Sequence, residues 1–215
     1  MVMMGFEKEK KELHDAMVAY KVPGIESAVN NARKAGMPAT EIIDAMGDGM
    51  TDVGTLFERG RLFLPHVLSA AAGMKKAMEI LGPELMKNAD YGKAKAKVVM
   101  GTVEGDVHDI GKSICSTMLQ CAGFEVHDLG RDVPKDSFIN EIKGGCSFCG
   151  MSALMTTTMT VMKDVIETLK TDNLRSKVTV MIGGAPVTQA YCDKIGADIY
   201  GDSASETTEK AKNWT

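Results

Sequence analysis

The sequence lacks the features that mark several protein classes. No apolar run approaches the roughly 20 residues that a membrane-spanning helix needs. The first residues, MVMMGFEKEKKELHD, become charged before the apolar core of a signal peptide develops, so we expect a cytoplasmic protein. Lys and Arg form no basic cluster and the formal net charge is -4, which argues against a nucleic-acid-binding surface, because phosphate contacts need grouped cations.

Disulfide, zinc-finger and nucleotide-phosphate patterns are also missing. Five Cys, an odd number at irregular spacing, predict free thiols rather than a disulfide framework. Cys146 and Cys149 form a CxxC, but no second Cys or His pair accompanies them at zinc-finger spacing, and we expect both to be core thiols. Neither a Walker loop nor a GxGxxG is present, so a nucleotide phosphate site is poorly supported.

The chain has two halves of different pattern. They meet at residues 88–96, where NADYGKAKA interrupts the apolar periodicity, and we predict a helical domain at 1–90 and a second domain at 91–215. In the first half, apolar residues recur at helical spacing. These residues are Leu13, Met17 and Tyr20; Ile25, Val29 and Ala32; Ile43, Met46, Met50 and Val53; and Val67, Leu68, Ala71 and Met78.

Proline and glycine divide this first half into four helices. Proline favours the first turn of a helix, and glycine favours the position just after its end. Four helices with short connections predict an antiparallel bundle. The expected helix beginnings are at Pro23, Pro38 and Pro65, and the expected ends are at Gly36, Gly60 and Gly82.

The second half alternates short β-rich runs with helical stretches. This alternation predicts an α/β domain with a doubly wound, Rossmann-like parallel sheet. Such a sheet binds its ligand beyond the carboxyl ends of its strands, so the site is expected in the loops after 103, 129, 152 and 184. The predicted strands are 97–103, 124–129, 146–152, 178–184 and 197–201, and the predicted helices are about 111–122, 134–143, 157–171, 186–195 and 203–213.

The loop after the first strand carries a histidine between two aspartates. A neutral imidazole can give one nitrogen to a metal while its other N–H donates to a carboxylate. Either Asp106 or Asp109 would serve as that partner of His108. The alternative without a ligand is that His108 caps the helix that begins near residue 111. Elsewhere, His14 and His127 have no neighbouring constellation, and a histidine after Pro65, His66, is expected to cap a helix or lie at an interface.

Two further loops carry small or hydroxyl residues. Ser152 and the three threonines 156–158 follow the third strand, where hydroxyls can bind a buried polar ligand or cap the next helix. The fourth strand ends at Gly183 and Gly184, which permit close approach of a ligand or of another backbone.

Three elements in order, D-x-H-x-x-G (106–111), S-x-L (152–154) and GG (183–184), resemble the pattern of cobalamin-binding domains. Between successive elements lie 40 and 28 residues. The chain is similar to the B12 module of methionine synthase and, more closely, to the small corrinoid proteins of methylotrophic methyltransferase systems, methylamine type. The stretch 48–71 resembles the helical bundle that caps the corrin in that family, so the resemblance covers nearly the whole chain.

The resemblance implies a bound cobalamin or related corrinoid, in its methylcob(III)alamin and cob(I)alamin forms. His108 would be the metal ligand below cobalt, and Asp106 would hydrogen-bond its distal nitrogen. Thr158 stands where the family has a Ser that completes this relay. Further corrinoid-binding positions implied are Gly105, Val107, Asp109, Gly111, Ser152, Leu154, Thr156, Gly183, Gly184 and Ala204, with Phe57 and Leu64 either shielding the upper face or simply filling the bundle core.

The function implied is that of a methyl carrier and not of a complete enzyme. It would accept a methyl group from a substrate-specific methyltransferase for methylamine, methanol or a similar donor, and pass it to a second methyltransferase acting on coenzyme M or tetrahydrofolate. A reductive activation protein is a further implied partner, whereas nucleic acid and membrane are not. The alternatives are a B12-dependent regulator and the small subunit of a mutase. Surface residues expected to meet the partners are Glu58, Arg59, Arg61, His66, Arg131 and Asp132.

Overall fold

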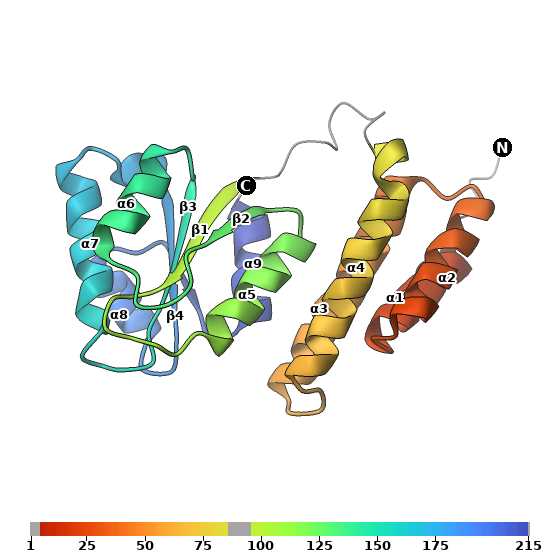
Figure 1. The fold of residues 1–215 in the computed structure, drawn as a ribbon, viewed down its shortest axis with the longest axis horizontal. Helices are drawn as coiled ribbons and strands as arrows, with labels where there is room; N and C mark the ends of the chain where they lie inside the picture. Colours follow the sequence, from red (N-terminus) through yellow and green to blue (C-terminus); the bar gives the residue numbers. More distant parts are fainter. Residues whose placement is uncertain (1–4, 86–95, 215) are drawn as a thin grey trace. The chain divides into compact units, whose positions relative to one another are not determined.

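The computed structural model describes residues 5–85 and 96–214. The chain divides into two compact units, residues 1–93 and 94–215, the first helical and the second built around a sheet (Figure 1). The predicted boundary between residues 90 and 91 lies outside the described residues and stays a prediction. Within the described ranges, no helix has both the length and the apolar composition needed to cross a bilayer.

The helical unit contains the four predicted helices: α1 (Glu7–Val18), α2 (Val22–Lys34), α3 (Ala39–Glu58) and α4 (Leu64–Leu85). Their apolar residues at helical spacing meet in one core, in which Leu13, Met17, Val29 and Met46 are fully buried. The predicted helix beginnings are confirmed, because one proline precedes α3 and the other two lie in the first turns of α2 and α4.

The predicted end of the fourth helix at Gly82 was wrong. Helix α4 continues to Leu85 with Gly82 and Pro83 inside it, although proline has no N–H to donate within the helix. The buried Leu81 and Leu85 lie on either side of these two residues. The predicted apolar face of this helix was wrong in part, because Val67 is buried as expected but Leu68 and Met78 are exposed. The buried face instead includes small residues such as Gly73, where an added Cβ would come within 2.2 Å of Ile25 Cδ1. Small residues let the helices approach closely, which hydrophobicity alone does not indicate.

The second unit is a five-stranded parallel sheet, as predicted. Its strands are β1 (Lys97–Thr102), β2 (Glu125–Asp128), β3 (Phe148–Ser152), β4 (Thr179–Gly183) and β5 (Ile199–Gly201), in the order β2-β1-β3-β4-β5. Each predicted bound of a strand or helix in this unit lies within three residues of the observed one. The chain first adds β2 on one side of β1 and then adds β3 on the other, which makes the β1–β3 junction the topological switch point.

Helices cover both faces of this sheet (Figure 1). Helices α5 (Ile110–Cys121) and α9 (Ala204–Trp214) pack on one face, around Leu119 and Ala211. Helices α6 (Lys135–Lys143), α7 (Met159–Thr171) and α8 (Gln189–Ile195) pack on the other, around Phe138, Met162 and Cys192. A short 3₁₀ helix, η1 (Arg175–Lys177), was not predicted.

Candidate functional site

The carboxyl ends of β1 and β3 lie side by side at the switch point, with Thr102 opposite Ser152. The loop after β1 carries Asp106 and His108, and the loop after β3 leads into α7 through Thr158. The structure therefore places the first two predicted site loops at the edge where an open parallel sheet binds its ligand.

The side chain of Asp106 connects these two loops. It is fully buried, and it accepts five hydrogen bonds. Its Oδ1 accepts from the backbone N–H of His108 at 3.0 Å and from the ring Nδ1 at 2.8 Å. Its Oδ2 accepts from Leu154 N at 2.7 Å, Met155 N at 3.2 Å and Thr158 Oγ1 at 3.0 Å. The Asp106 carboxylate thus fixes the position of the loop after β1 relative to the loop after β3.

These hydrogen bonds keep Asp106 ionised. Burial by itself raises the pKa of a carboxyl group, because it penalises the charged form. The backbone N–H groups of His108 and Leu154, the ring of His108 and the N–H of Met155 outweigh that penalty and hold the pKa of Asp106 well below its usual range. The site therefore contains a buried anion, the Asp106 carboxylate, in hydrogen-bond contact with His108.

The orientation of His108 follows from this anion. An ionised carboxylate only accepts hydrogen bonds, so Nδ1 carries the proton and the lone pair of the neutral ring lies on Nε2. The side chain of His108 is 49% exposed, which leaves Nε2 open to an external ligand. Asp106 and not Asp109 is the carboxylate partner, and the imidazole does not cap α5.

Two residues that were not predicted for the site hold the His108 loop in place. Thr102 is fully buried at the end of β1; its Oγ1 donates to the carbonyl of His108 at 3.2 Å and hydrogen-bonds Ser152 Oγ at 3.0 Å. Asp132, expected on the partner-facing surface, accepts from the backbone N–H of Gly105 at 2.7 Å. A polar residue ending an otherwise apolar strand was the available signal for Thr102.

An ion pair between the buried Lys112 and the partly exposed Asp128 supports the start of α5. The ammonium group of Lys112, one residue after the D-x-H-x-x-G motif, contacts both oxygens of Asp128 at 2.5 and 2.6 Å. Ser116 donates to the same carboxylate at 2.8 Å. This pair was not predicted, because burial of a lysine cannot be inferred until its partner on another element is known.

The two glycines at the end of β4 let neighbouring backbone segments approach closely. An added Cβ at Gly184, whose φ is +123°, would lie 1.9 Å from the carbonyl oxygen of Ala153, and one at Gly183 would lie 3.0 Å from that of Gly201. Of the two possibilities that the sequence left open, close approach of another backbone is the one that the structure shows. Ala204, the remaining residue predicted near these loops, begins α9 and packs against the core on that face.

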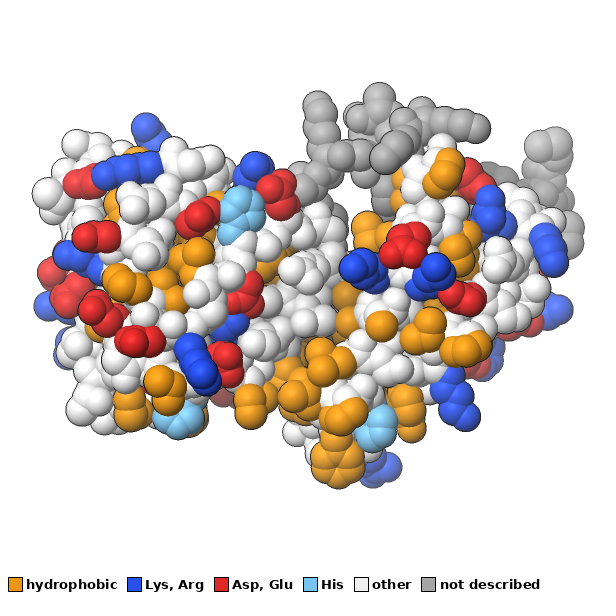
Figure 2. Space-filling model, in the orientation of Figure 1, with side chains coloured by type: hydrophobic (Ala, Val, Ile, Leu, Met, Phe, Trp, Pro, Cys, Tyr) orange, Lys and Arg blue, Asp and Glu red, His pale blue; other side chains and the backbone are white. Residues whose placement is uncertain are grey.

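Apolar side chains are exposed on the two site loops. Val107, Ile110 and Leu154 are 56%, 63% and 46% exposed, and exposed hydrophobic side chains are visible on the sheet-containing unit in Figure 2. Thr156 is also exposed. A histidine with exposed apolar residues on its own loop and on the neighbouring loop fits a broad, largely apolar ligand that offers a metal atom to Nε2.

Two of the predicted corrinoid-binding residues and His66 lie in the helical unit. Phe57 near the end of α3 and Leu64 at the start of α4 are half-buried, and their contact with a corrinoid stays a prediction. The predicted capping role of His66 is confirmed, since its Nδ1 accepts from the backbone N–H of Phe63 at 2.9 Å.

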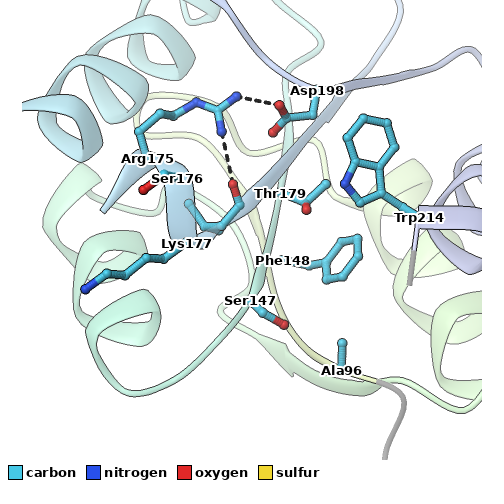
Figure 3. Close-up of a pocket in the computed structure, with 10 residues that line it drawn as sticks. Ala96, Ser147, Phe148, Arg175, Ser176, Lys177, Thr179, Asp198 and Trp214 are labelled. Carbon is cyan, nitrogen blue, oxygen red and sulfur yellow. Dashed lines mark hydrogen bonds and ion pairs between the residues drawn. The ribbon is translucent and has the colours of Figure 1, made fainter. Parts of the chain in front are cut away.

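A separate hollow of about 600 Å³ lies at the opposite, amino-terminal edge of the sheet (Figure 3). Phe148 and Thr179, the first residues of β3 and β4, line it together with Trp214. Arg175 faces Asp198 there and donates to it at 2.7 Å, so its charge is already paired. Ligands of open α/β sheets bind at the other edge, which leaves the Asp106–His108 group as the candidate site.

One sequence-based interpretation was wrong about histidines. His127 was expected to have no neighbouring constellation, yet its ring lies between Glu125 and Glu141 and beside Cys146. His14 also has partners, Asp15 and Asp52. Glu141 and Cys146 lie 14 and 19 residues from His127 in the sequence, so only the fold brings these three residues together.

Comparison with protein families agrees with the site. A family model described as the B12 binding domain matches residues 96–209, and a second B12 binding domain model matches residues 9–81. The first alone spans more than half of the chain. The parallel sheet and the two matched segments thus define a protein with a B12-binding domain.

Individual proteins narrow this class. Dimethylamine corrinoid protein 2 of Methanosarcina acetivorans is 52% identical over 211 residues, which cover 98% of this chain and 97% of that protein. A cobalamin-binding protein from Desulfitobacterium hafniense DCB-2 has a TM-score of 0.83 at 33% identity, covering 96% of this chain and 98% of its own. The methanol:cobalamin methyltransferase complex MtaBC of Methanosarcina barkeri has a TM-score of 0.76 at 29% identity, covering 97% and 80%. The chain belongs to the family of methylamine-type corrinoid proteins, which confirms the resemblance found in the sequence.

Proposed function

We propose that this chain is a methyl carrier that holds a corrinoid with Nε2 of His108 as the nitrogen ligand below cobalt. The observation that carries the proposal is the buried Asp106 carboxylate, which receives Nδ1–H of His108 and so directs the lone pair of Nε2 outward. When bound, the corrinoid supplies a cobalt centre that takes up and releases a methyl group.

The residues around His108 would control its proton and its position. Asp106 stabilises a proton on Nδ1, and Thr158 Oγ1 donates to the other oxygen of the same carboxylate at 3.0 Å. Thr102 holds the carbonyl of His108. This contact supports Thr158 as the hydroxyl that completes the relay, where the resemblance implies a serine. Gain or loss of the proton at this pair would tune how strongly Nε2 donates.

We propose two methyltransferases as partners of the carrier. One would load the methyl group from a methylamine or a similar donor, and the other would transfer it to coenzyme M or tetrahydrofolate. The similarity to a methyltransferase complex and to dimethylamine corrinoid proteins supports such partners. A reductive activation protein completes the proposed set. Relatives that match over nearly their whole length are corrinoid proteins, which favours the carrier over a regulator or a mutase subunit.

The substitution His108→Ala tests this function. Without the imidazole, corrinoid reconstituted into the protein should show the visible spectrum of a form with no nitrogen ligand, and it should dissociate faster on gel filtration. His14→Ala serves as a matched control, because His14 is also hydrogen-bonded to a carboxylate but lies in the helical unit. A spectrum of His108→Ala equal to that of the wild type would overturn the ligand assignment.

A further inference from the structure

A histidine, a glutamate and a cysteine converge on the edge of the sheet at β2. His127 belongs to β2, Glu141 lies near the end of α6, and Cys146 comes just before β3. Their ligand atoms all lie within 4.8 Å of one another, and they form a group of metal-ligating side chains among the residues that the structure describes. These residues belong to neither loop of the Asp106–His108 site.

The spacing of the three atoms fits a single small cation. His127 Nδ1 lies 2.7 Å from Glu141 Oε2 and 4.0 Å from Cys146 Sγ, and Sγ lies 3.9 Å from Oε2. The point equidistant from these atoms in their plane is about 2 Å from each, close to the usual lengths of zinc bonds to nitrogen, oxygen and sulfur. Only small movements of the side chains would complete three ligand bonds.

A second carboxylate orients the histidine. Glu125 Oε1 lies 3.0 Å from Nε2 of His127, and the same carboxylate is paired with Lys97. Zinc-binding histidines commonly donate their other N–H to a carboxylate, which fixes the tautomer and makes the ligating nitrogen more basic. Glu125 is positioned for that role, which leaves Nδ1 toward the other two ligands.

Charge and burial also suit a thiophilic dication. A thiolate at Cys146 and a carboxylate at Glu141 together balance two positive charges. Cys146 is buried, whereas His127 and Glu141 are each about one-third exposed, so solvent reaches one side of the group. Burial and the adjacent Glu141 raise the pKa of the Cys146 thiol, and the hydrogen bonds that the His127 ring donates to Glu125 and Glu141 raise the pKa of His127. Without a metal ion, the thiol and the imidazole therefore keep their protons.

We propose that His127, Glu141 and Cys146 form a Zn²⁺ site with an open fourth position, separate from the corrinoid. Binding would release the thiol proton and the proton between Nδ1 and Glu141 to solvent, while Nδ1, the carboxylate and the thiolate become ligands. Three protein ligands and one position for water are the usual set of a zinc site open to solvent.

The test measures zinc on the full-length protein. The chain is stripped with a chelator, dialysed against micromolar ZnCl₂ and freed of excess metal, and zinc is then counted by mass spectrometry. We expect one zinc per chain for the wild type and a loss of stoichiometric zinc for Cys146→Ala and for His127→Asn. Glu125→Gln keeps the three ligands and should weaken zinc affinity about tenfold or more.

Matched controls separate the site from surface binding. His14 is as exposed as His127 and also has two carboxylate partners but no cysteine, so His14→Asn should keep its zinc. Cys121→Ser removes a thiol at the end of α5 and should also keep it. X-ray absorption at the zinc edge should show one sulfur at about 2.3 Å in the wild type.

Several results would overturn the zinc site. The wild type could bind no zinc, or X-ray absorption could show no sulfur among the ligands of the zinc. The Cys146→Ala variant could also bind as much zinc as the wild type. Fluorescence of Trp214, the single tryptophan, establishes that each variant is folded. If Cys146→Ala does not fold, Glu141→Gln replaces it, and retention of full affinity there would count equally against the site.

Discussion

At the scale of single residues, one buried carboxylate organises the candidate site. Asp106 has no exposed surface, and each of its oxygens has at least two donors. Removing an acceptor from such a group leaves buried donors unsatisfied, which costs more than the hydrogen bond itself contributes. Asp106 therefore acts on stability and on the orientation of His108 together.

We expect Asp106→Asn to lower the free energy of unfolding at about pH 7 by about 1–3 kcal/mol, because an amide cannot accept at both of its ends. The pKa of Asp106 is depressed in the folded state, so its stabilisation is present above the unfolded value of 3.8 and is lost as the pH falls through the lower folded value. The difference between wild type and variant should accordingly shrink in strong acid. Urea unfolding followed by Trp214 fluorescence measures it, and a difference that grows on acidification would contradict an ionised Asp106.

At the scale of elements, the site depends on how the ends of neighbouring strands approach. The loop after β4 reaches the loop after β3 so closely that Gly184 has no room for a side chain against Ala153. The φ of +123° at Gly184 is also one that residues with a Cβ rarely adopt. The backbone of the loop after β4 thus limits the conformation of the loop after β3.

Gly184→Ala should therefore destabilise the sheet-containing unit by at least about 2 kcal/mol, since the added methyl group meets the Ala153 carbonyl and the backbone is strained. Gly111→Ala is the matched control, because an added Cβ there has no atom within 4 Å. That control should leave the stability equal or raise it by up to about 1 kcal/mol, as expected for Ala in a helix. Urea midpoints for both variants give the comparison, and equal midpoints would contradict the close approach.

At the scale of the whole molecule, the two units have separate cores. The sheet-containing unit buries apolar side chains on both faces of its sheet. Every hydrogen bond to the Asp106 carboxylate comes from within residues 108–158. The helical unit has its own buried residues and contributes none of these donors.

A fragment of residues 94–215 should consequently unfold cooperatively and bind corrinoid with the spectrum of the full chain, whereas residues 1–93 should bind none. Dissociation of the corrinoid should be faster from the fragment if Phe57 and Leu64 shield it. Spectroscopic titration and gel filtration measure both properties. Failure of a folded fragment to bind would show that the helical unit supplies part of the binding energy.

The sequence by itself determined the fold class and the candidate site. Alternating β-rich and helical stretches predict a parallel sheet with helices on both faces, and the strands β1, β3 and β4 are buried accordingly. His108 and Asp106 follow the first strand directly. Proline preferences marked the helix beginnings in the first half. These features depend on neighbours along the chain, which is why sequence patterns contain them.

Only the tertiary structure decided features that depend on distant partners. The fold determined that Asp106, and not Asp109, is the hydrogen-bond partner of His108, and that Thr102 belongs to the site. It also determined that small residues of α4, and not Leu68, are buried. It also brought His127 to Cys146, which are 19 residues apart. Hydrophobic periodicity and motif spacing describe one segment at a time. Packing between segments depends on shape and on the hydrogen-bond needs of buried groups, and these exist only once the chain has folded.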